Sequence, residues 1–341
     1  MPIATTEQYL EMIANAKARK FAYPAINIVN IEGLTGAIEA FAELETDGMV
    51  QVSTGGGAHA TGSLADAPLG AKILAETAHA LAEKYNVLVV LHTDHCIKAK
   101  LGPFMDPLIT WSEERVKNGE KPLFNSHMFD GSELPLAENL ELGVQYAKRL
   151  AASNMLIEVE TGVVGGEEDG IDNSHVKAEK LYTTPEEMCD VYEALNDIYP
   201  FLYAATFGNV HGVYKPGNVK LTPEILKNGQ EAVAAKFGTE ANPLSLVFHG
   251  GSGSSEEEIA ETLAYGVVKM NVDTDTQYAF TRPVVDHIMK NYDGVLKIGG
   301  EVGNKKVYDP RSYLKAGSAG LKDRVKQAVR DLHGEGSSLL N

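Results

Sequence analysis

A short apolar run at residues 87–91 constrains the fold of this chain most. Its sequence, Val-Leu-Val-Val-Leu, is continuous rather than alternating, which is typical of a strand buried on both faces in a parallel sheet. Residues 92–96, His-Thr-Asp-His-Cys, follow it directly, and two later apolar runs lead in the same way to His211 and to His249. Parallel-sheet folds keep their reactive side chains at the carboxyl ends of strands, so we expect these histidines to converge on one metal ion.

Eight predicted strands alternate with helices along the chain, the pattern of an α/β protein. The strands are expected at residues 21–27, 49–53, 87–92, 123–128, 155–160, 202–206, 246–248 and 267–272. Eight such units make a (β/α)8 barrel, or TIM barrel, and we predict a single domain over residues 1–341 with additional terminal helices. A doubly wound open sheet is the alternative, but the chain has neither a G-x-G-x-x-G motif after the first strand nor a Walker A motif.

Three further segments carry specific expectations. Residues 161–180 are rich in glycine and acidic side chains and lack apolar periodicity, so we predict a mobile loop over the active site. Residues 53–57, Ser-Thr-Gly-Gly-Gly, are predicted to form a flexible loop after the second strand. Residues 309–332 are predicted to form a C-terminal helix outside the eightfold repeat, which could pack on a partner subunit.

The charge and the cysteine content exclude several classes of protein. The chain has 30 Lys and Arg residues against 47 Asp and Glu residues, and its net charge of −17 argues against binding to nucleic acids or anionic membranes. The two cysteines, Cys96 and Cys189, make no disulfide framework and are typical of a reducing compartment. Without a signal-peptide core or an apolar run near the roughly 20 residues of a membrane span, we expect a cytoplasmic protein.

The histidines at the predicted strand ends favour zinc. A single histidine in such a place is usually a structural residue, but three at the same end of one barrel indicate a metal site. Neutral imidazoles suit zinc, and three protein ligands with an open position are typical of catalytic zinc. His92 and His95 both remain candidates for the first ligand, and His95 is favoured because it lies beyond the predicted strand end.

A glycine-rich segment suggests a phosphate site. Residues 250–254, Gly-Gly-Ser-Gly-Ser, follow the seventh predicted strand and precede a helix. Backbone N–H groups of such a loop, at this position of a barrel, often bind phosphate. Residues 271–274, Asn-Val-Asp-Thr, end the neighbouring eighth strand, and Ser53 offers a hydroxyl group to the same or a second phosphate. A tight turn with a capping serine is the alternative interpretation.

Carboxylates near the predicted metal site offer groups for proton transfer. Asp94 stands beside a proposed ligand, where a metal would poise its charge. Residues 167–169, Glu-Glu-Asp, lie in the long loop, and a mobile loop can bring such a carboxylate over a metal site as a base. Asp130 and Glu160 end the fourth and fifth strands and are candidates for supporting the ligands or for an alternative metal position.

Seven short motifs, distributed over almost the whole chain, resemble one known family. They are Pro-Ala-Ile-Asn at 24–27, His-Thr-Asp-His-Cys at 92–96, Gly-Gly-Glu-Glu-Asp-Gly at 165–170, Asn-Val-His-Gly-Val-Tyr at 209–214, His-Gly-Gly-Ser-Gly at 249–253, Asn-Val-Asp-Thr-Asp at 271–275 and Tyr-Asp-Pro-Arg at 308–311. With no departure at a motif position, the chain resembles class II, zinc-dependent fructose-bisphosphate aldolases of the bacterial IIA type.

The resemblance implies a (β/α)8 barrel that forms a homodimer and binds zinc. The implied zinc ligands are His95, His211 and His249. Asp130 and Glu160 match the ligands of a second, alternative metal position. A monovalent cation, Na+ or K+, is implied at backbone oxygens near Val210, Gly212 and Gly250.

The resemblance also implies a substrate and a mechanism. The activity is reversible aldol cleavage of fructose 1,6-bisphosphate to dihydroxyacetone phosphate and glyceraldehyde 3-phosphate, in glycolysis and gluconeogenesis. Zinc polarises the ketone, Glu168 removes the adjacent proton, zinc and Asn271 hold the enediolate, and Asp94 protonates the new hydroxyl group or acts as the base in cleavage. The positions that match substrate-binding residues are Asn27, Ser53, Gly212, Gly250, Gly251, Ser252, Asn271, Val272, Asp273, Thr274 and Arg311, the last reaching a phosphate from the neighbouring subunit.

Three other functions compete with this one. Tagatose bisphosphate differs from fructose bisphosphate at one stereocentre, and an aldolase for it would need the same residues. A Schiff-base aldolase would use Lys269 on the eighth strand, but would leave the three histidines without a role. A non-catalytic barrel that binds zinc or a phosphosugar would need neither Asp94 nor Glu168.

Overall fold

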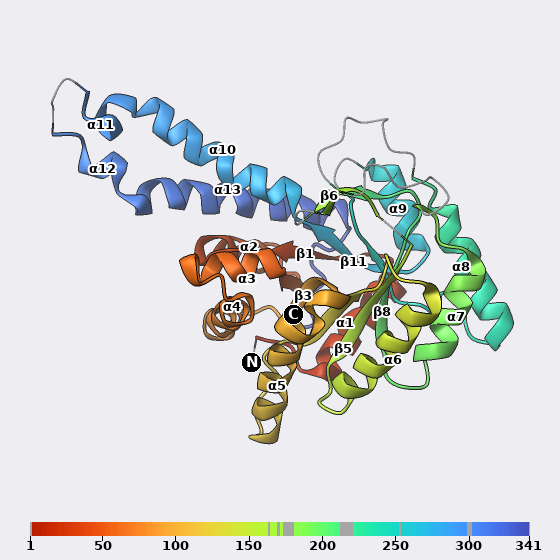
Figure 1. Cartoon of the computed structure of the whole chain (residues 1–341). Coiled ribbons are helices and arrows are strands. Elements are labelled where there is room, and N and C mark those ends of the chain that lie inside the picture. Colours follow the sequence, from red (N-terminus) through yellow and green to blue (C-terminus); the bar gives the residue numbers. More distant parts are fainter. Residues whose placement is uncertain are drawn as a thin grey trace.

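The computed structural model describes residues 2–162, 164–168, 171–172, 181–211, 221–251, 254–298 and 302–340; the side chains within 165–168 and 171–172 and at 211 are not described. Eight parallel strands close into one barrel, in the order β1-β11-β10-β8-β5-β4-β3-β2, which confirms the predicted fold (Figure 1). Their bounds are β1 (Tyr23–Asn27), β2 (Gly48–Val52), β3 (Val89–Ile97), β4 (Ser126–Asp130), β5 (Leu156–Thr161), β8 (Phe201–Ala205), β10 (Leu246–Phe248) and β11 (Val267–Val272). Because every barrel pair is parallel, all the carboxyl ends form one rim.

Helices surround the barrel and bury their apolar faces against it. They are α2 (Ile31–Glu43), α4 (Ala67–Ala82), α5 (Asp106–Lys117), α6 (Leu136–Ala151), α7 (Pro185–Leu195), α8 (Glu224–Phe237) and α9 (Glu256–Ala264), with short 3-10 turns at Gly62–Leu64 and Lys98–Lys100 and a π-helical turn at Leu101–Met105. Several begin at residues that the sequence marks as caps. Thr184 forms a capping box with Glu187, and Pro185 occupies the first position of α7. No described helix has the length and apolarity that crossing a membrane requires.

The interior of the barrel has an apolar layer below and a polar layer above. Helix α1 (Thr6–Arg19) closes the amino-terminal end, and its residues Tyr9 and Met12 pack into the same buried cluster as Val90 and Leu156 of the strands. Side chains two positions apart on a strand point to the same face. Above this apolar cluster, five strands contribute side chains that are polar and fully buried, namely Gln51, His92, Ser126, Glu158 and Lys269.

The glycine-rich segment after β2 is a helix, so the prediction of a flexible loop there is wrong. Ser53 caps α3 (Thr54–Ala60) by accepting a hydrogen bond from the Gly56 N–H. The helix packs closely on α4, where a Cβ added at Gly70 would lie 1.8 Å from the carbonyl oxygen of Gly57. Glycine is unfavourable within a helix by propensity, but here it permits the contact between the two backbones.

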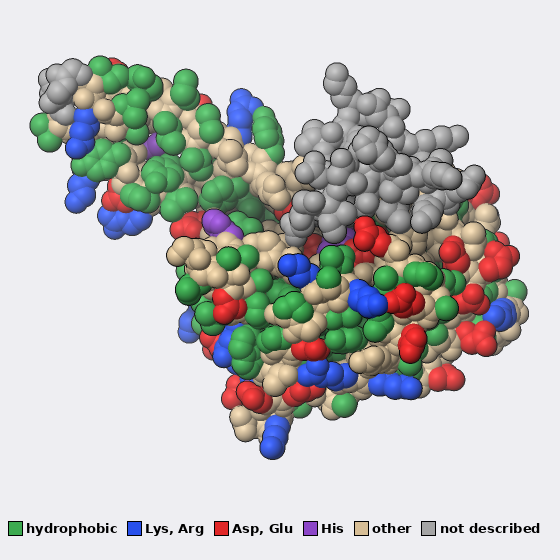
Figure 2. Space-filling model, in the orientation of Figure 1, with side chains coloured by type: hydrophobic (Ala, Val, Ile, Leu, Met, Phe, Trp, Pro, Cys, Tyr) green, Lys and Arg blue, Asp and Glu red, His purple; other side chains and the backbone are tan. Residues whose placement is uncertain are grey.

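A long helical arm extends from the barrel (Figure 1). It consists of α10 (Thr274–Lys290), α11 (Tyr292–Leu296), α12 (Lys305–Tyr308) and α13 (Pro310–Asp331). The prediction of a C-terminal helix over 309–332 is confirmed by α13. Apolar side chains gather on the visible face of this arm (Figure 2). The exposed large apolar residues of these helices and of the segment between α11 and α12 include Tyr278, Val285, Met289, Tyr292, Leu296, Ile298 and Val302.

Part of the long segment after β5 has regular structure. The strands β6 (Gly165–Glu168) and β7 (Ile171–Asp172) pair in antiparallel fashion, and β6 pairs in parallel with β9 (Val210–His211). Strand pairing therefore orders the backbone at these positions, while the movement of residues 161–180 over the active site stays a prediction. Residues 173–180 of this segment lie outside the described part of the chain.

We expect the Gly70→Ala substitution to lower the free energy of unfolding by about 1–3 kcal/mol, because the added methyl group forces α3 and α4 apart. Urea denaturation of both proteins measures the difference. Gly102→Ala is the matched control, because a Cβ there meets nothing within 4 Å. Equal stability of the Gly70→Ala variant and the control would show that the two helices do not pack as described.

Candidate metal centre and active site

The strand that carries Asp94 and His95 contains a β-bulge. It extends to Ile97, so the prediction that His95 lies beyond the strand end is wrong. Pairing with β4 shifts between Thr93 and Cys96, on either side of Asp94 and His95. Neighbouring side chains of a regular strand point to opposite faces, and a bulge re-aims them. Both side chains can therefore contribute to the same site.

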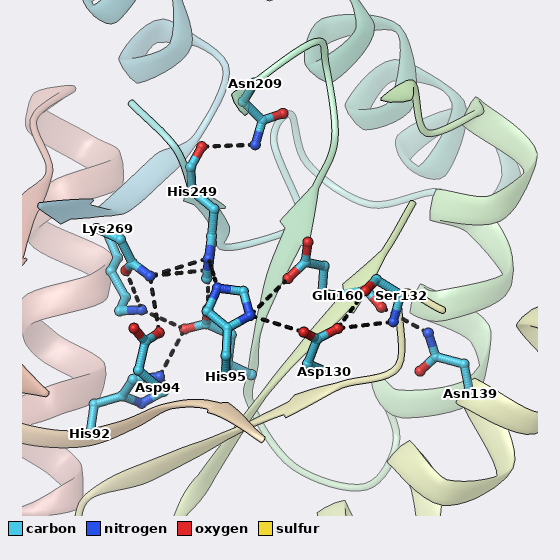
Figure 3. A network of polar contacts seen from close by, with 12 residues as sticks. His92, Asp94, His95, Asp130, Ser132, Asn139, Glu160, Asn209, His249 and Lys269 are labelled. Carbon is cyan, nitrogen blue, oxygen red and sulfur yellow. Dashed lines mark hydrogen bonds and ion pairs between the residues drawn. The ribbon is translucent and has the colours of Figure 1, made fainter. Parts of the chain in front are cut away.

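The structure brings Asp94, His95 and His249 together, with one possible ligand atom from each within 4.8 Å of the others (Figure 3). His95 belongs to β3 and His249 follows β10, and the two residues are 154 positions apart in the sequence. Their rings meet edge to face, with His95 Nε2 and His249 Nδ1 2.9 Å apart. The predicted convergence of these two histidines is confirmed.

The hydrogen bonds of the two rings fit a bound cation. His95 Nδ1 lies 3.0 Å from Asp130 Oδ2, and His249 Nε2 lies 2.7 Å from Glu158 Oε1. Ionised carboxylates only accept hydrogen bonds, so in neutral rings these nitrogens carry the hydrogen. Burial lowers the pKa of His249, which favours its neutral form. The two facing nitrogens then both present lone pairs, which is the arrangement that a metal ion stabilises.

A second group of possible ligands lies beside the first. It consists of His95, Asp130 and Glu160, and Glu160 Oε2 is 3.7 Å from His95 Nδ1. Burial by itself would raise the pKa of Asp130, but hydrogen bonds from His95 and Ser132 bring it down to about 2. Asp130 is therefore an anion at neutral pH. The expectation that Asp130 and Glu160 either support a ligand or form an alternative metal position fits this geometry.

His92 contacts Ser126 and Glu158 rather than the candidate metal ligands, which favours His95 as the ligand of the motif. Its Nδ1 lies 2.7 Å from Ser126 Oγ, and its Nε2 lies 3.3 Å from Glu158 Oε2 at an angle that makes no hydrogen bond. Burial and the charge of Lys269 lower the pKa of His92. His92 belongs to the polar layer below the site, and His95 is the candidate ligand.

The buried pair of Glu158 and Lys269 lies directly below the candidate ligands, and sequence reasoning did not place Glu158. Lys269 Nζ donates to Glu158 Oε2 at 2.9 Å, and neither side chain is exposed. Burial by itself would raise the pKa of Glu158, but Lys269 and His92 with the His249 hydrogen bond hold it well below its ordinary value. The signal in the sequence was a charged residue inside each of two strands predicted to be buried.

Two side-chain amides donate to Asp94, and a third supports one of them. Asn27 Nδ2 donates to Asp94 Oδ2 at 2.8 Å, and Asn271 Nδ2 donates to Oδ1 at 3.1 Å. Gln51, a second residue that sequence reasoning missed, donates in turn to Asn27 Oδ1 at 2.5 Å. Both oxygens of Asp94 accept hydrogen bonds, so the carboxylate is held in a defined orientation beside His95.

The glycine-rich turn after β10 approaches the backbone of β9. Gly250 has a φ of +64°, and a Cβ there would lie 2.6 Å from the carbonyl oxygen of Val210. Asn209 Nδ2 donates to the His249 carbonyl at 2.8 Å and so connects the two segments. Gly251 faces the Met270 side chain, where a Cβ would lie 2.1 Å from the terminal methyl group. At position 250 only glycine fits, because a Cβ would meet backbone atoms, whereas at position 251 the end of the Met270 side chain would have to move.

A cleft of about 380 Å³ opens beside this network, between α2, α3 and α10. Among its lining residues are Asn27, Asp273 and His59, a histidine to which the sequence assigned no role. Asp273 accepts from Gln277 Nε2 at 2.8 Å, and Thr274 begins α10. The side chain of Val272, by contrast, belongs to the core between barrel and helices, so only its backbone can contact a ligand.

Several predicted site residues lie partly or wholly outside the part of the chain that the structure describes. Gly212 and Ser252 are among the undescribed residues, and only the backbone of His211 and Glu168 is described. The pairing of Gly166 with His211 nevertheless aligns the strand that carries Glu168 with the strand that carries the third histidine. Arg311 lies in the first turn of α13, at the outer end of the arm, so the structure does not bring it to the site of its own chain (Figure 1).

Fold and site together define a class of protein, a (β/α)8 barrel with histidines and carboxylates that could hold a metal ion at the carboxyl ends of its strands. A model of the class-II fructose-bisphosphate aldolase family matches residues 7–337. The chain belongs to this family.

Individual relatives agree with this assignment. A fructose-bisphosphate aldolase of Mycobacterium bovis is 55% identical over 344 residues, which cover 99% of each chain. One of Streptomyces coelicolor is also 55% identical, over 99% of this chain and 100% of its own. The crystal structure of fructose-bisphosphate aldolase from Campylobacter jejuni has a TM-score of 0.87 at 41% identity and covers 98% of this chain and 97% of that one.

We expect His95→Ala to weaken zinc binding by more than about 100-fold, because loss of a group that merely supports a ligand already costs roughly 10–100-fold. Competition with a chelating dye measures the affinity of the purified protein. His333→Asn is the control, since His333 is exposed and its left-handed backbone conformation, with a φ of +58°, suits asparagine. Unchanged zinc affinity of His95→Ala would place the metal elsewhere.

Proposed function

We propose that this protein catalyses the reversible aldol cleavage of fructose 1,6-bisphosphate to dihydroxyacetone phosphate and glyceraldehyde 3-phosphate, in glycolysis and gluconeogenesis. The observation that carries the proposal is the convergence of Asp94, His95 and His249 in a member of this aldolase family. A proton-transfer carboxylate beside two metal-type ligands is what aldol chemistry at a metal centre requires.

The metal is proposed to be zinc, held by His95, His249 and His211. When bound, zinc supplies a Lewis acid that polarises the ketone carbonyl of the substrate. The two imidazoles with facing nitrogens support this assignment, because histidine nitrogens are preferred zinc ligands. Asp130 and Glu160 are proposed to hold the ion at its alternative position, together with His95.

A monovalent cation, Na+ or K+, is proposed at the backbone oxygens near Val210, Gly212 and Gly250. The close approach of the Val210 carbonyl to Gly250 supports it, since carbonyl oxygens are ligands for such ions. The same turn continues into the phosphate site proposed at Gly212, Gly250, Gly251, Ser252 and at residues 271–274, where Val272 would contribute its backbone. Ser53 at the amino terminus of α3 is proposed to contribute to substrate binding as well.

Asp94 is proposed to be the acid and base at the hydroxyl group of the bond that is cleaved. Its two oxygens accept hydrogen bonds from Asn27 and Asn271, which orient the carboxylate toward one position. In cleavage Asp94 takes the hydroxyl proton, and in condensation it returns that proton to the new alkoxide oxygen. Asn27 is at the same time a proposed substrate contact.

Glu168 is proposed to transfer the proton at the carbon next to the carbonyl group of dihydroxyacetone phosphate. The alignment of β6 with β9 supports this role, because it relates the Glu168 strand to His211. Asn271 is proposed to donate to the oxygen on which negative charge develops, which preorganised donors stabilise.

A homodimer is proposed, with Arg311 binding the second phosphate of the partner's substrate. The arm supports this, because its exposed apolar side chains would be buried against another subunit. The side chain of Arg311 is 88% exposed and pairs only locally with Asp309 among the described ion pairs. It is therefore available to a neighbouring molecule.

The same contacts disfavour two of the competing functions. The ammonium group of Lys269 is paired with Glu158 and also donates to Asn271 Oδ1, which makes it a poor Schiff-base nucleophile. A barrel that only binds zinc or a phosphosugar would gain nothing from the amides that orient Asp94. Tagatose bisphosphate remains the second candidate substrate, because the described contacts do not distinguish the two sugars.

We expect cleavage of fructose 1,6-bisphosphate by the purified protein to disappear after EDTA treatment and to return with zinc. A coupled assay for the triose phosphates measures it, with a metal assay to verify removal. Activity that persists in zinc-free protein would favour the Schiff-base mechanism at Lys269, which borohydride trapping would then test. A zinc-loaded protein that is inactive on fructose bisphosphate but active on tagatose bisphosphate would change the assigned substrate.

We expect Asp94→Ala to lose cleavage by at least about 100-fold, the lower end of the contribution of a proton-transfer group. Glu168→Ala should slow exchange of the dihydroxyacetone phosphate proton with solvent, which NMR in D2O measures. If Glu168→Ala exchanged this proton at the wild-type rate, the role of Glu168 would be wrong.

We expect Arg311→Ala and Asp94→Ala to restore one another in mixed dimers. One site of each heterodimer then has both residues, so random reassembly recovers about a quarter of wild-type activity. Refolding or co-expression of the two variants, followed by assay, measures this. Arg330→Ala on the same helix is the control variant and should be active alone. No recovery from proven heterodimers would mean that Arg311 does not act across the interface.

A further inference from the structure

A buried ion pair crosses the interior of the barrel just below the candidate ligands. Glu158 is on β5 and Lys269 is on β11, and two strands, β8 and β10, separate them in the barrel order. Both side chains are completely buried. A buried ion pair often contributes less to stability than apolar side chains of the same size. Packing alone therefore does not explain these residues.

The first contact of this pair reaches a candidate metal ligand. His249 Nε2 lies 2.7 Å from Glu158 Oε1, and an ionised carboxylate can only accept. The hydrogen of the neutral ring is therefore on Nε2, and Nδ1 is left with its lone pair. That Nδ1 is the atom that faces His95 Nε2. A carboxylate behind a histidine fixes both its tautomer and its orientation toward a metal.

The second contact of the pair reaches the amide beside Asp94. Lys269 Nζ donates to Asn271 Oδ1 at 2.8 Å. An ammonium group can only donate hydrogen bonds, so Lys269 holds the oxygen of the Asn271 amide toward itself. The NH2 group of the same amide is thereby turned toward Asp94. The same NH2 group lies 3.1 Å from Asp94 Oδ1 and 3.2 Å from His249 Nδ1, so it is placed between the proposed acid and base and the candidate metal ligand.

We propose that Glu158 and Lys269 are positioning residues, which through one buried ion pair fix the tautomer of His249 for metal binding and the amide orientation of Asn271 for the reaction. The inference rests on the proposed function for the role of Asn271. The first half of the proposal, on the tautomer of His249, concerns metal affinity alone. The second half, on the amide of Asn271, concerns the reaction. Neither residue touches the substrate, since both lie in the layer below the site.

The substitution Glu158→Gln tests the first half, because the two ends of a glutamine side chain differ. Lys269 can only donate, so the amide oxygen of the glutamine turns toward it, and the NH2 group turns toward His249 Nε2. His249 then carries its hydrogen on Nδ1, where it blocks the metal. We expect zinc affinity to fall roughly 10–100-fold.

The double variant E158Q/K269M separates the tautomer from packing. Without the ammonium group, the glutamine oxygen is free to accept from His249 Nε2, and the pair is neutral in total. We expect zinc affinity to return to within about threefold of wild type, and the Co2+ absorption spectrum, which reports ligand geometry, to return with it. Turnover should stay low, because Asn271 has lost the donor that orients its amide.

The single variant Lys269→Met tests the second half. Glu158 still accepts from His249, so zinc affinity should stay within about threefold of wild type, while kcat falls at least tenfold with a smaller change in KM. Asp47→Asn is the matched control. Asp47 is a buried carboxylate that accepts from Leu88 N and Ser338 Oγ, away from the metal ligands, so its loss should leave zinc affinity and spectrum unchanged.

Three measurements on the four variants decide the proposal. They are zinc affinity from dye competition, the Co2+ spectrum and, for Lys269→Met, kcat. Wild-type affinity and spectrum in Glu158→Gln overturn the first half, as does equal weakening in Glu158→Gln and the double variant. Wild-type kcat in zinc-loaded Lys269→Met overturns the second. If Glu158→Gln does not fold, recovered affinity in the charge-balanced double variant supports the tautomer, and weak affinity overturns it. A wild type that binds zinc but cleaves no sugar bisphosphate refutes the proposed function, while the zinc data still decide the first half.

Discussion

The closure of eight parallel strands into one ring is the constraint on which the site depends. Asp94 and His95 come from β3 and His249 follows β10, strands far apart in sequence and not adjacent in the ring. The ring places their carboxyl ends at one rim, where the three side chains come together as a possible ligand group. Below the rim, an apolar layer closed by α1 provides stability, so the layer above it can accept the cost of buried charges.

Two features adapt this general scaffold to chemistry, a bulge in one strand and a polar layer beneath the site. The bulge in β3 allows neighbouring residues, Asp94 and His95, to serve one site, with one placed among amides and the other against a carboxylate and a second imidazole. The polar layer holds these groups from beneath through hydrogen bonds that run without a break from Gln51 to Asn27, Asp94 and Asn271, then through Lys269 and Glu158 to His249. Such a network has few alternative arrangements, because the ammonium group can only donate and the carboxylates can only accept.

Much of the fold could be predicted from the sequence, because buried parallel strands leave continuous apolar runs and the helices between them leave capping residues. The segment at 53–57 was mispredicted since glycine disfavours helix by propensity, whereas the contact of Gly57 with Gly70 outweighs it. The bulge was missed because a register shift is a property of two paired strands. Glu158 was missed as a site residue because its partners, Lys269 and His249, are more than 90 positions away.

The sequence by itself determined the eightfold alternation, the three histidine-bearing strand ends and the family motifs, because these depend on local pattern and residue type. Tertiary structure decided which histidine of the 92–96 motif joins His249, since this depends on the direction of a side chain after the bulge. It also decided that the amides of Asn27 and Asn271 face Asp94, and that Arg311 is carried away from its own site by the arm. Local pattern identifies the reactive groups, but their mutual orientation follows from barrel closure, which brings together residues that the chain keeps apart.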